Sequence, residues 1–84
     1  MSENEVRDEP ENSRYVITID GREAVLEYDR QGDRIRLHHT KVPPALEGEG
    51  VGSRLARTAL ESAREEGLAV WPECPFVAAY IRRH

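Results

Sequence analysis

The feature that most restricts the fold of this chain is a glycine-rich run at residues 47–52, EGEGVG, which stands directly before an amphipathic helical pattern. Pro43 and Pro44 precede the run and end the strand that leads into it, because neither proline can donate a ladder hydrogen bond. Gly67 suits the position just after the helix. Between these limits the apolar residues recur at helical spacing, at Val51, Leu55, Ala56, Ala59, Leu60 and Ala63. The run therefore connects a strand to a helix of residues 50–66.

Three alternating segments precede the glycine run and predict an antiparallel meander. Two-residue turns at 20–21 (Asp-Gly) and 32–33 (Gly-Asp) separate the segments, as in β-hairpins. The residues that alternate onto one face are Tyr15, Ile17 and Ile19 in the first segment, Ala24, Leu26 and Tyr28 in the second, and Ile35 and Leu37 in the third.

The end of the chain predicts one more strand and one more helix. Residues 68–71, LAVW, form a short apolar run typical of a buried parallel strand, and Pro72 ends it. Pro75 suits the first turn of a last helix, whose inward residues are Phe76, Val77, Tyr80 and Ile81. The order βββ-α-β-α predicts a small α/β fold, in which a mixed sheet has the helices packed on it and the last two strands are parallel neighbours.

Charge divides the chain into two parts. Residues 1–13 contain five acidic side chains against Arg7 alone, and they account for the whole net charge of −4. Such a polar segment buries too little apolar surface to offset the entropy of ordering, so we expect a disordered acidic tail at 1–13 and one domain at 14–84.

The composition of residues 14–84 makes several classes of partner unfavourable. Eleven acidic and eleven basic side chains balance there, so the clustered positive charge of a nucleic-acid-binding surface is missing. No apolar run approaches the roughly 20 residues of a membrane-spanning helix, and no secretory signal is evident, so we expect a cytoplasmic protein without membrane attachment. The single cysteine and three histidines have no metal-ligand spacing, so we expect no metal site.

A glycine run between a strand and a helix is an arrangement that binds anions. It points free backbone N–H groups at the ligand, and the helix dipole favours phosphate oxygens. The run lacks the Gly-Lys-Ser/Thr ending of a P-loop and the GxGxxG pattern of a dinucleotide fold. Two alternatives stay open at this point, because three glycines can also form only a tight turn, and Glu47 and Glu49 are unfavourable beside an anion.

The segment 48–55, GEGVGSRL, resembles the coenzyme A pyrophosphate loop of the GCN5-related N-acetyltransferase (GNAT) superfamily, Gln/Arg-x-x-Gly-x-Gly/Ala, with Glu47 at the Gln/Arg position. The blocks at 39–43 (HTKVP) and 72–81 (PECPFVAAYI) resemble its minimal YjdJ-like branch. The resemblance implies an N-acyltransferase that takes acetyl-CoA as donor and an amine as acceptor. The residues it implies for coenzyme A binding are Val42, Gly48, Glu49, Gly50, Val51, Gly52, Ser53 and Arg54.

His39 and Cys74 are the candidate catalytic residues. Each follows or ends one of two neighbouring parallel strands, at the sheet edge where α/β proteins bind ligands. Cys74 also precedes a helix N-terminus, which favours the thiolate. We expect Cys74 to accept the acyl group or to line the acyl pocket, with His39 as general base.

Alternatives to this catalytic assignment come from strand register and from the small size of the chain. The alternation places His39 on the apolar face and His38 with the arginines, but one bulge would exchange the two histidines. His39 and Cys74 could also be ordinary packing residues. The alternative function is a non-catalytic coenzyme A or acyl-CoA binding module, and the sequence determines neither the acceptor nor the oligomeric state.

Overall fold

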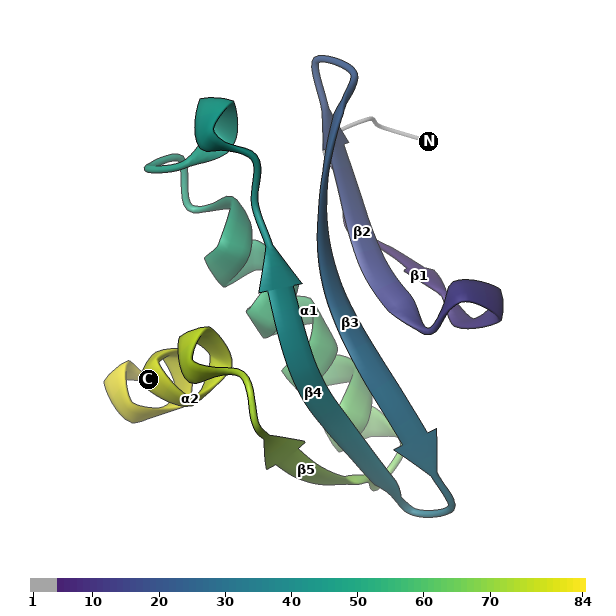
Figure 1. Cartoon of the computed structure of the whole chain (residues 1–84). Coiled ribbons are helices and arrows are strands. Elements are labelled where there is room, and N and C mark those ends of the chain that lie inside the picture. The colour runs from purple at the N-terminus through teal and green to yellow at the C-terminus, as the bar shows by residue number, and fades with distance from the viewer. Residues whose placement is uncertain (1–4) are drawn as a thin grey trace.

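The computed structural model describes residues 5–84, which form one sheet and two α-helices (Figure 1). The strands are β1 (Arg7–Glu9), β2 (Arg14–Ile19), β3 (Arg22–Gln31), β4 (Arg34–Lys41) and β5 (Ala69–Pro72). The helices are α1 (Val51–Glu65) and α2 (Pro75–Arg83), and short 3-10 turns lie at η1 (Pro10–Asn12) and η2 (Pro44–Leu46). From β2 onward the element order is βββ-α-β-α, so the predicted small α/β fold is confirmed.

The sheet has the order β1-β2-β3-β4-β5. Strands β2, β3 and β4 form the expected antiparallel meander, and β4 pairs with β5 in parallel. The turn between β2 and β3 requires positive φ at both central residues, 52° at Asp20 and 76° at Gly21, as tight hairpin turns do. Helix α1 makes the crossover from the end of β4 to the start of β5 (Figure 1).

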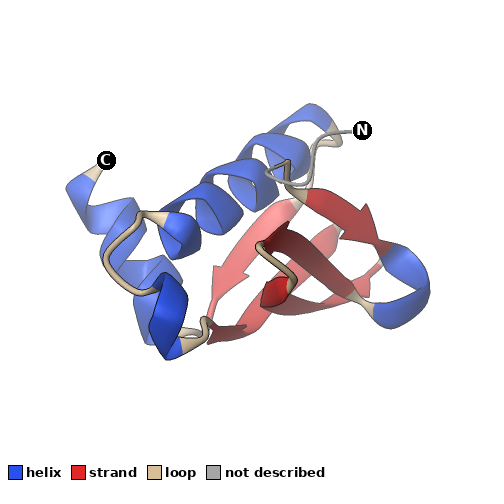
Figure 2. Ribbon diagram, turned by 90° about the horizontal axis from the view of Figure 1, so that it is seen from above, coloured by secondary structure: helices blue, strands red, loops and turns tan. Residues whose placement is uncertain are grey.

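Both helices pack on the same face of the sheet, which we call the helix face (Figure 2). Helix α1 lies across β2 to β5, and α2 contacts α1, β4 and β5. The alternation in β2, β3 and β4 directs their apolar residues to this layer. The largest fully buried side chains of this core are Ile17, Leu26, Leu37, Leu55, Val51 and Val77. No helix of residues 5–84 covers the opposite face, which we call the open face (Figure 2).

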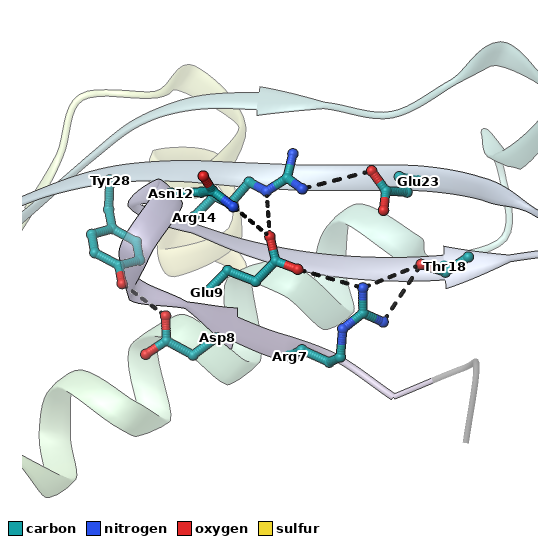
Figure 3. A network of polar contacts seen from close by, with 8 residues as sticks. All are labelled: Arg7, Asp8, Glu9, Asn12, Arg14, Thr18, Glu23 and Tyr28. Carbon is teal, nitrogen blue, oxygen red and sulfur yellow. Dashed lines mark hydrogen bonds and ion pairs between the residues drawn. The ribbon is translucent and has the colours of Figure 1, made fainter. Parts of the chain in front are cut away.

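The prediction of a disordered tail at 1–13 is wrong for the part of it that the structure describes. Strand β1 pairs antiparallel with β2, and η1 returns the chain to β2. Long-range polar contacts hold this segment (Figure 3): Tyr28 Oη donates to Asp8 at 2.7 Å, and Arg14 Nε donates to Glu9 at 2.8 Å. These contacts help to offset the entropy cost of ordering residues 7–12, which the burial of apolar surface alone would not offset. Residues 1–4 lie outside the described residues.

The predicted burial of the C-terminal elements is wrong in part. Strand β5 was expected to be buried on both sides, yet Ala69 and Trp71 are exposed, because they point to the open face. In α2, Val77 is buried as expected, whereas Phe76 and Ile81 are 37% and 40% exposed. One layer of helices cannot cover every apolar residue of such a short chain.

Candidate functional site

Strands β4 and β5 separate at the end of the sheet where the candidate residues lie. The last paired residues are Leu37 and Pro72, and Cys74 N–H donates to the Leu37 carbonyl at 2.9 Å. Strand β4 continues to Lys41, whereas the chain after Cys74 turns away into α2 (Figure 1). Within the described residues, positions 39–41 therefore have partner residues only on the β3 side.

A pocket of about 480 Å³ opens at this separation, and we call it the glycine-loop pocket. It lies between the end of β4, the loop that follows and the first turn of α1. Its lining residues are Thr40, Lys41, Val42, Leu46, Glu47, Gly48, Gly50, Val51, Gly52, Ser53 and Phe76.

The glycine loop has the backbone geometry that an anion cradle needs. Gly48 and Gly50 adopt φ values of 85° and 74°, in the left-handed region that favours glycine. Gly50 is the N-cap of α1 and makes no side-chain cap hydrogen bond, and the first turn contains no acidic residue. The first-turn N–H groups therefore keep their donors for an external acceptor, and the helix dipole favours a negative one.

Gly52 is required for a different reason. A Cβ atom at this position would lie 2.7 Å from Cζ of Phe76, which is closer than packed carbon atoms approach. The absence of a side chain lets the Phe76 ring of α2 rest on the first turn of α1, where both residues line the pocket. The pocket thus joins a polar backbone cradle to an apolar wall.

Most residues that the resemblance implied for coenzyme A binding line this pocket, but two do not. Val42, Gly48 and residues 50–53 line it. Glu49 is exposed outside the pocket, which removes one of the two unfavourable carboxylates. Arg54 is also exposed and lines a separate hollow of about 410 Å³ beside Arg57 and Glu5.

The sequence interpretation missed several lining residues, namely Thr40, Lys41, Leu46, Glu47 and Phe76. Thr40 and Lys41 lie just before Val42, on the part of β4 that extends beyond β5. The early end of β5 was therefore the feature that could have identified them as lining residues. Lys41 adds a positive charge beside the glycine loop. Phe76 comes from the second helix, and only the packing of α2 against α1 brings it to the pocket.

Cys74 lies on the helix face, where it is 5% exposed and unpaired in any disulfide. Its Sγ atom is 3.1 Å from Thr40 Oγ1. Burial raises the pKa of the thiol, but the Thr40 hydroxyl and the backbone amides of Val77, Phe76 and Thr40 outweigh burial, so the pKa is lowered. The sulfur makes no regular cap hydrogen bond to α2, so the helix amides act chiefly as nearby dipoles.

His39 is not on the apolar face, and that prediction is wrong. The register shifts at a bulge, so Glu27 pairs with His39 whereas the next residue, Tyr28, pairs with Leu37. The bulge leaves His38 without a partner and places His39 beside Glu27 on the open face, with an exposed side chain. Thr40, the residue after His39, points to the helix face instead. Cys74 therefore contacts Thr40 and not His39.

No group of three or more histidine, cysteine, aspartate or glutamate side chains among residues 5–84 is placed to bind a metal ion. No helix in that part of the chain is both long and apolar enough to span a bilayer.

Comparison with known proteins shows which family the chain resembles. Residues 14–84 match the model of the GCN5-related N-acetyl-transferase family. Protein NATD1 of Gallus gallus is 39% identical over 62 residues, which cover 73% of this chain and 56% of that protein. Protein NATD1 of Danio rerio is 27% identical over 82 residues, covering 94% of this chain and 74% of that protein.

The first of these matches covers little more than half of the relative's own length. The family model, in contrast, spans the meander, the glycine loop, both helices and β5. It therefore includes the separated strands and the uncapped start of α1 that form the glycine-loop pocket. The chain belongs to the family of GCN5-related N-acetyltransferases.

Proposed function

We propose that this chain binds acetyl-CoA in the glycine-loop pocket and transfers the acetyl group to an amine. The observation that carries the proposal is the loop itself: two left-handed glycines lead into a helix whose first-turn N–H groups have no side-chain cap. Those groups would bind the pyrophosphate. The part of β4 that extends beyond β5 would then lie along the pantetheine arm, which leads to Thr40 and Cys74.

The chemistry requires a base, a polarised carbonyl and a leaving thiolate. In the proposed reaction His39 takes a proton from the amine, whose nitrogen attacks the thioester carbon. A C–N bond forms, the C–S bond breaks, and the coenzyme leaves as a thiolate that is then protonated. Backbone N–H groups of the separated strands are suited to stabilise the carbonyl oxygen.

Cys74 has two possible roles in this scheme. Its lowered pKa and its place at the start of α2 support nucleophilic attack on the thioester, with an acetyl-cysteine intermediate that the amine then resolves. Its burial and its contact with Thr40 equally support a role in lining the acyl pocket. In that case the acetyl group would pass directly from the coenzyme to the amine. Mass spectrometry of the protein after brief mixing with acetyl-CoA distinguishes the roles by a gain of one acetyl group at Cys74.

The test of the function is release of free coenzyme A thiol in the presence of a panel of amines. We expect turnover by the unmodified chain and a loss of about 10²- to 10⁴-fold in His39→Ala, the range for removal of a general base. His38→Ala is the matched control, since His38 has no pairing partner at the bulge. Equal loss in both variants would contradict the assignment of His39.

A binding module without catalysis is the second candidate, and one observation favours it. His39 and Cys74 lie on opposite faces of the sheet, and neither lines the glycine-loop pocket. Tight binding of acetyl-CoA by calorimetry, combined with no thiol release with any amine, would support the binding module. Absence of acetyl-CoA binding would exclude both functions.

A further inference from the structure

A second hollow lies on the open face of the sheet, over the paired parts of β3, β4 and β5. Its volume is about 210 Å³, and we call it the open-face hollow. Cross-strand pairing brings its residues together, since Arg36 pairs with Asp29 on one side and with Trp71 on the other. The lining residues are Asp29, Gln31, Arg34, Arg36, Trp71 and Glu73.

The charges in the hollow leave cationic donors available. Arg36 is shared between two carboxylates, with 3.5 Å to Asp29 and 3.5 Å to Glu73. Its Nε atom is nevertheless buried without a hydrogen-bond partner, which is costly unless a ligand or water accepts from it. Arg34 makes no ion pair within the described part of the chain. Two guanidinium groups thus face one small space, and this arrangement suits a carboxylate.

The apolar part of the hollow is Trp71. Its side chain is 55% exposed, which is unusual for so large an apolar residue away from a binding surface. Glu73 lies two residues further along and directly precedes Cys74, so its carboxylate borders the point where β4 and β5 separate. An amine held by Glu73 would therefore lie beside the proposed thioester position.

The glycine-loop pocket lies beyond the paired parts of β4 and β5, between the end of β4 and the start of α1, whereas the hollow lies on the open face of the paired parts. His39, the proposed base, is on the open face, in line with Glu27. If acetyl-CoA occupies the glycine-loop pocket, the amine acceptor would approach the thioester from the open face. The two hollows share no lining residue, so donor and acceptor would not compete for space.

We propose that the open-face hollow binds the acceptor, and that the acceptor is a small zwitterion of free amino acid size that carries an amine and a carboxylate. This inference rests on the proposed acetyltransferase function. Arg34 and Arg36 would bind the carboxylate, Trp71 would contact the apolar side chain, and Glu73 would direct the amine to the strand separation. A polyamine fits less well, because it has no carboxylate for Arg34 and Arg36 to bind.

The first test needs no acetyl-CoA. Trp71 is the only tryptophan of the chain, so its fluorescence reports occupation of the hollow. Titration with a panel of free amino acids should give a saturable change for at least one of them. The matching amino acid amide, which lacks the carboxylate, should bind at least about tenfold more weakly. Equal binding of acid and amide, or no saturable change with any amino acid, would overturn the inference.

Arg34→Gln is the diagnostic variant, with Arg57→Gln on α1 as its control. Arg34 is exposed, so the replacement leaves the core intact. We expect the amino acid to bind at least about tenfold more weakly to Arg34→Gln, a charged hydrogen bond being lost. Unchanged binding would refute the role of Arg34.

Kinetics then separate this inference from the proposed function. If transfer occurs, Arg34→Gln should raise KM for the amino acid about tenfold and change kcat little, because a binding contact is removed. Equal kcat/KM for an amino acid and its amide would refute the zwitterion while leaving acetyl transfer in place. Amino acid binding that depends on Arg34, without any transfer, would instead refute the proposed function alone.

Discussion

The two outer strands of the sheet are both short, but they end in opposite ways. Strand β1 returns at once through η1 to β2, and side-chain contacts to Tyr28, Arg14 and Thr18 fasten it to the neighbouring strands (Figure 3). Strand β5 ends while β4 continues to Lys41, and the chain leaves it as α2. The β1 edge thus stabilises the sheet, whereas the β5 side exposes backbone and has two hollows, the proposed ligand sites. Substitutions at the two edges should therefore affect different measurements.

The largest expected effect is at the β5 side, in Gly52→Ala. The new Cβ would lie 2.7 Å from Cζ of Phe76, so the ring would have to move, and it would be pushed into the glycine-loop pocket. We expect acetyl-CoA affinity, measured by calorimetry, to fall by about tenfold or more, equal to about 1.4 kcal/mol or more. Thr58→Ala, on the same helix but outside that pocket, is the control. Unchanged affinity in Gly52→Ala would place the ligand elsewhere.

Gly50→Ala should weaken both stability and binding. Gly50 has φ of 74° at the N-cap of α1, and an L-residue in that conformation costs about 1–2 kcal/mol. Urea unfolding should show this loss in the free energy of unfolding. Gly50→Asn should lose less, because asparagine tolerates the left-handed region. Equal losses in both variants would indicate that backbone conformation is not the cause.

At the β1 edge, Tyr28→Phe should reduce stability without reducing acetyl-CoA affinity. The variant removes the donor of the 2.7 Å hydrogen bond to Asp8, which contributes about 1 kcal/mol to the free energy of unfolding. Urea unfolding and calorimetry on the same preparations test both halves of this prediction. A fall in affinity comparable to that of Gly52→Ala would show that the two edges are coupled.

Tyr28 also predicts how stability changes at alkaline pH. Burial of the phenol, and then its hydrogen bond to the Asp8 carboxylate, raise the pKa of Tyr28. A raised pKa means that its contribution is complete below the unfolded pKa of about 10 and is lost as pH rises above it. Urea midpoints measured from pH 8 to 11.5 should fall above about pH 10, and less steeply in Tyr28→Phe. Identical slopes would rule out Tyr28 as the titrating group.

The smallest expected effect is on the thiol in Thr40→Val. This variant keeps the shape of the side chain and removes the hydroxyl that lies 3.1 Å from Cys74 Sγ. Because that hydroxyl favours the thiolate, the pKa of Cys74 should rise. Thiolate absorbance in the ultraviolet, followed against pH, measures it directly. Thr40→Ser restores a hydroxyl and should return the pKa toward its original value, and a rise in both variants would exclude the contact as the cause.

Different regions of the molecule were predictable to different degrees. The meander, α1 and its end at Gly67 followed from alternation, turn residues and helical spacing, which act within a few residues. Strand β1 was not predictable in this way, because its stability depends on partners such as Tyr28, 20 positions along the chain from Asp8. The glycines of the glycine-loop pocket were found from their pattern, whereas Leu46 and Glu47 were missed and Phe76 required the packing of two helices.

Local sequence was sufficient for the order of the elements from β2 onward and for the glycine loop, because φ preferences, proline and hydrophobic periodicity act on neighbouring residues. Only the tertiary structure decided which face each candidate residue occupies. A single bulge in β4 moved His39 to the open face, and the early end of β5 left the end of β4 without a neighbour beside the proposed ligand site. Register and strand length depend on cross-strand hydrogen bonds and helix packing, which join residues far apart in the chain.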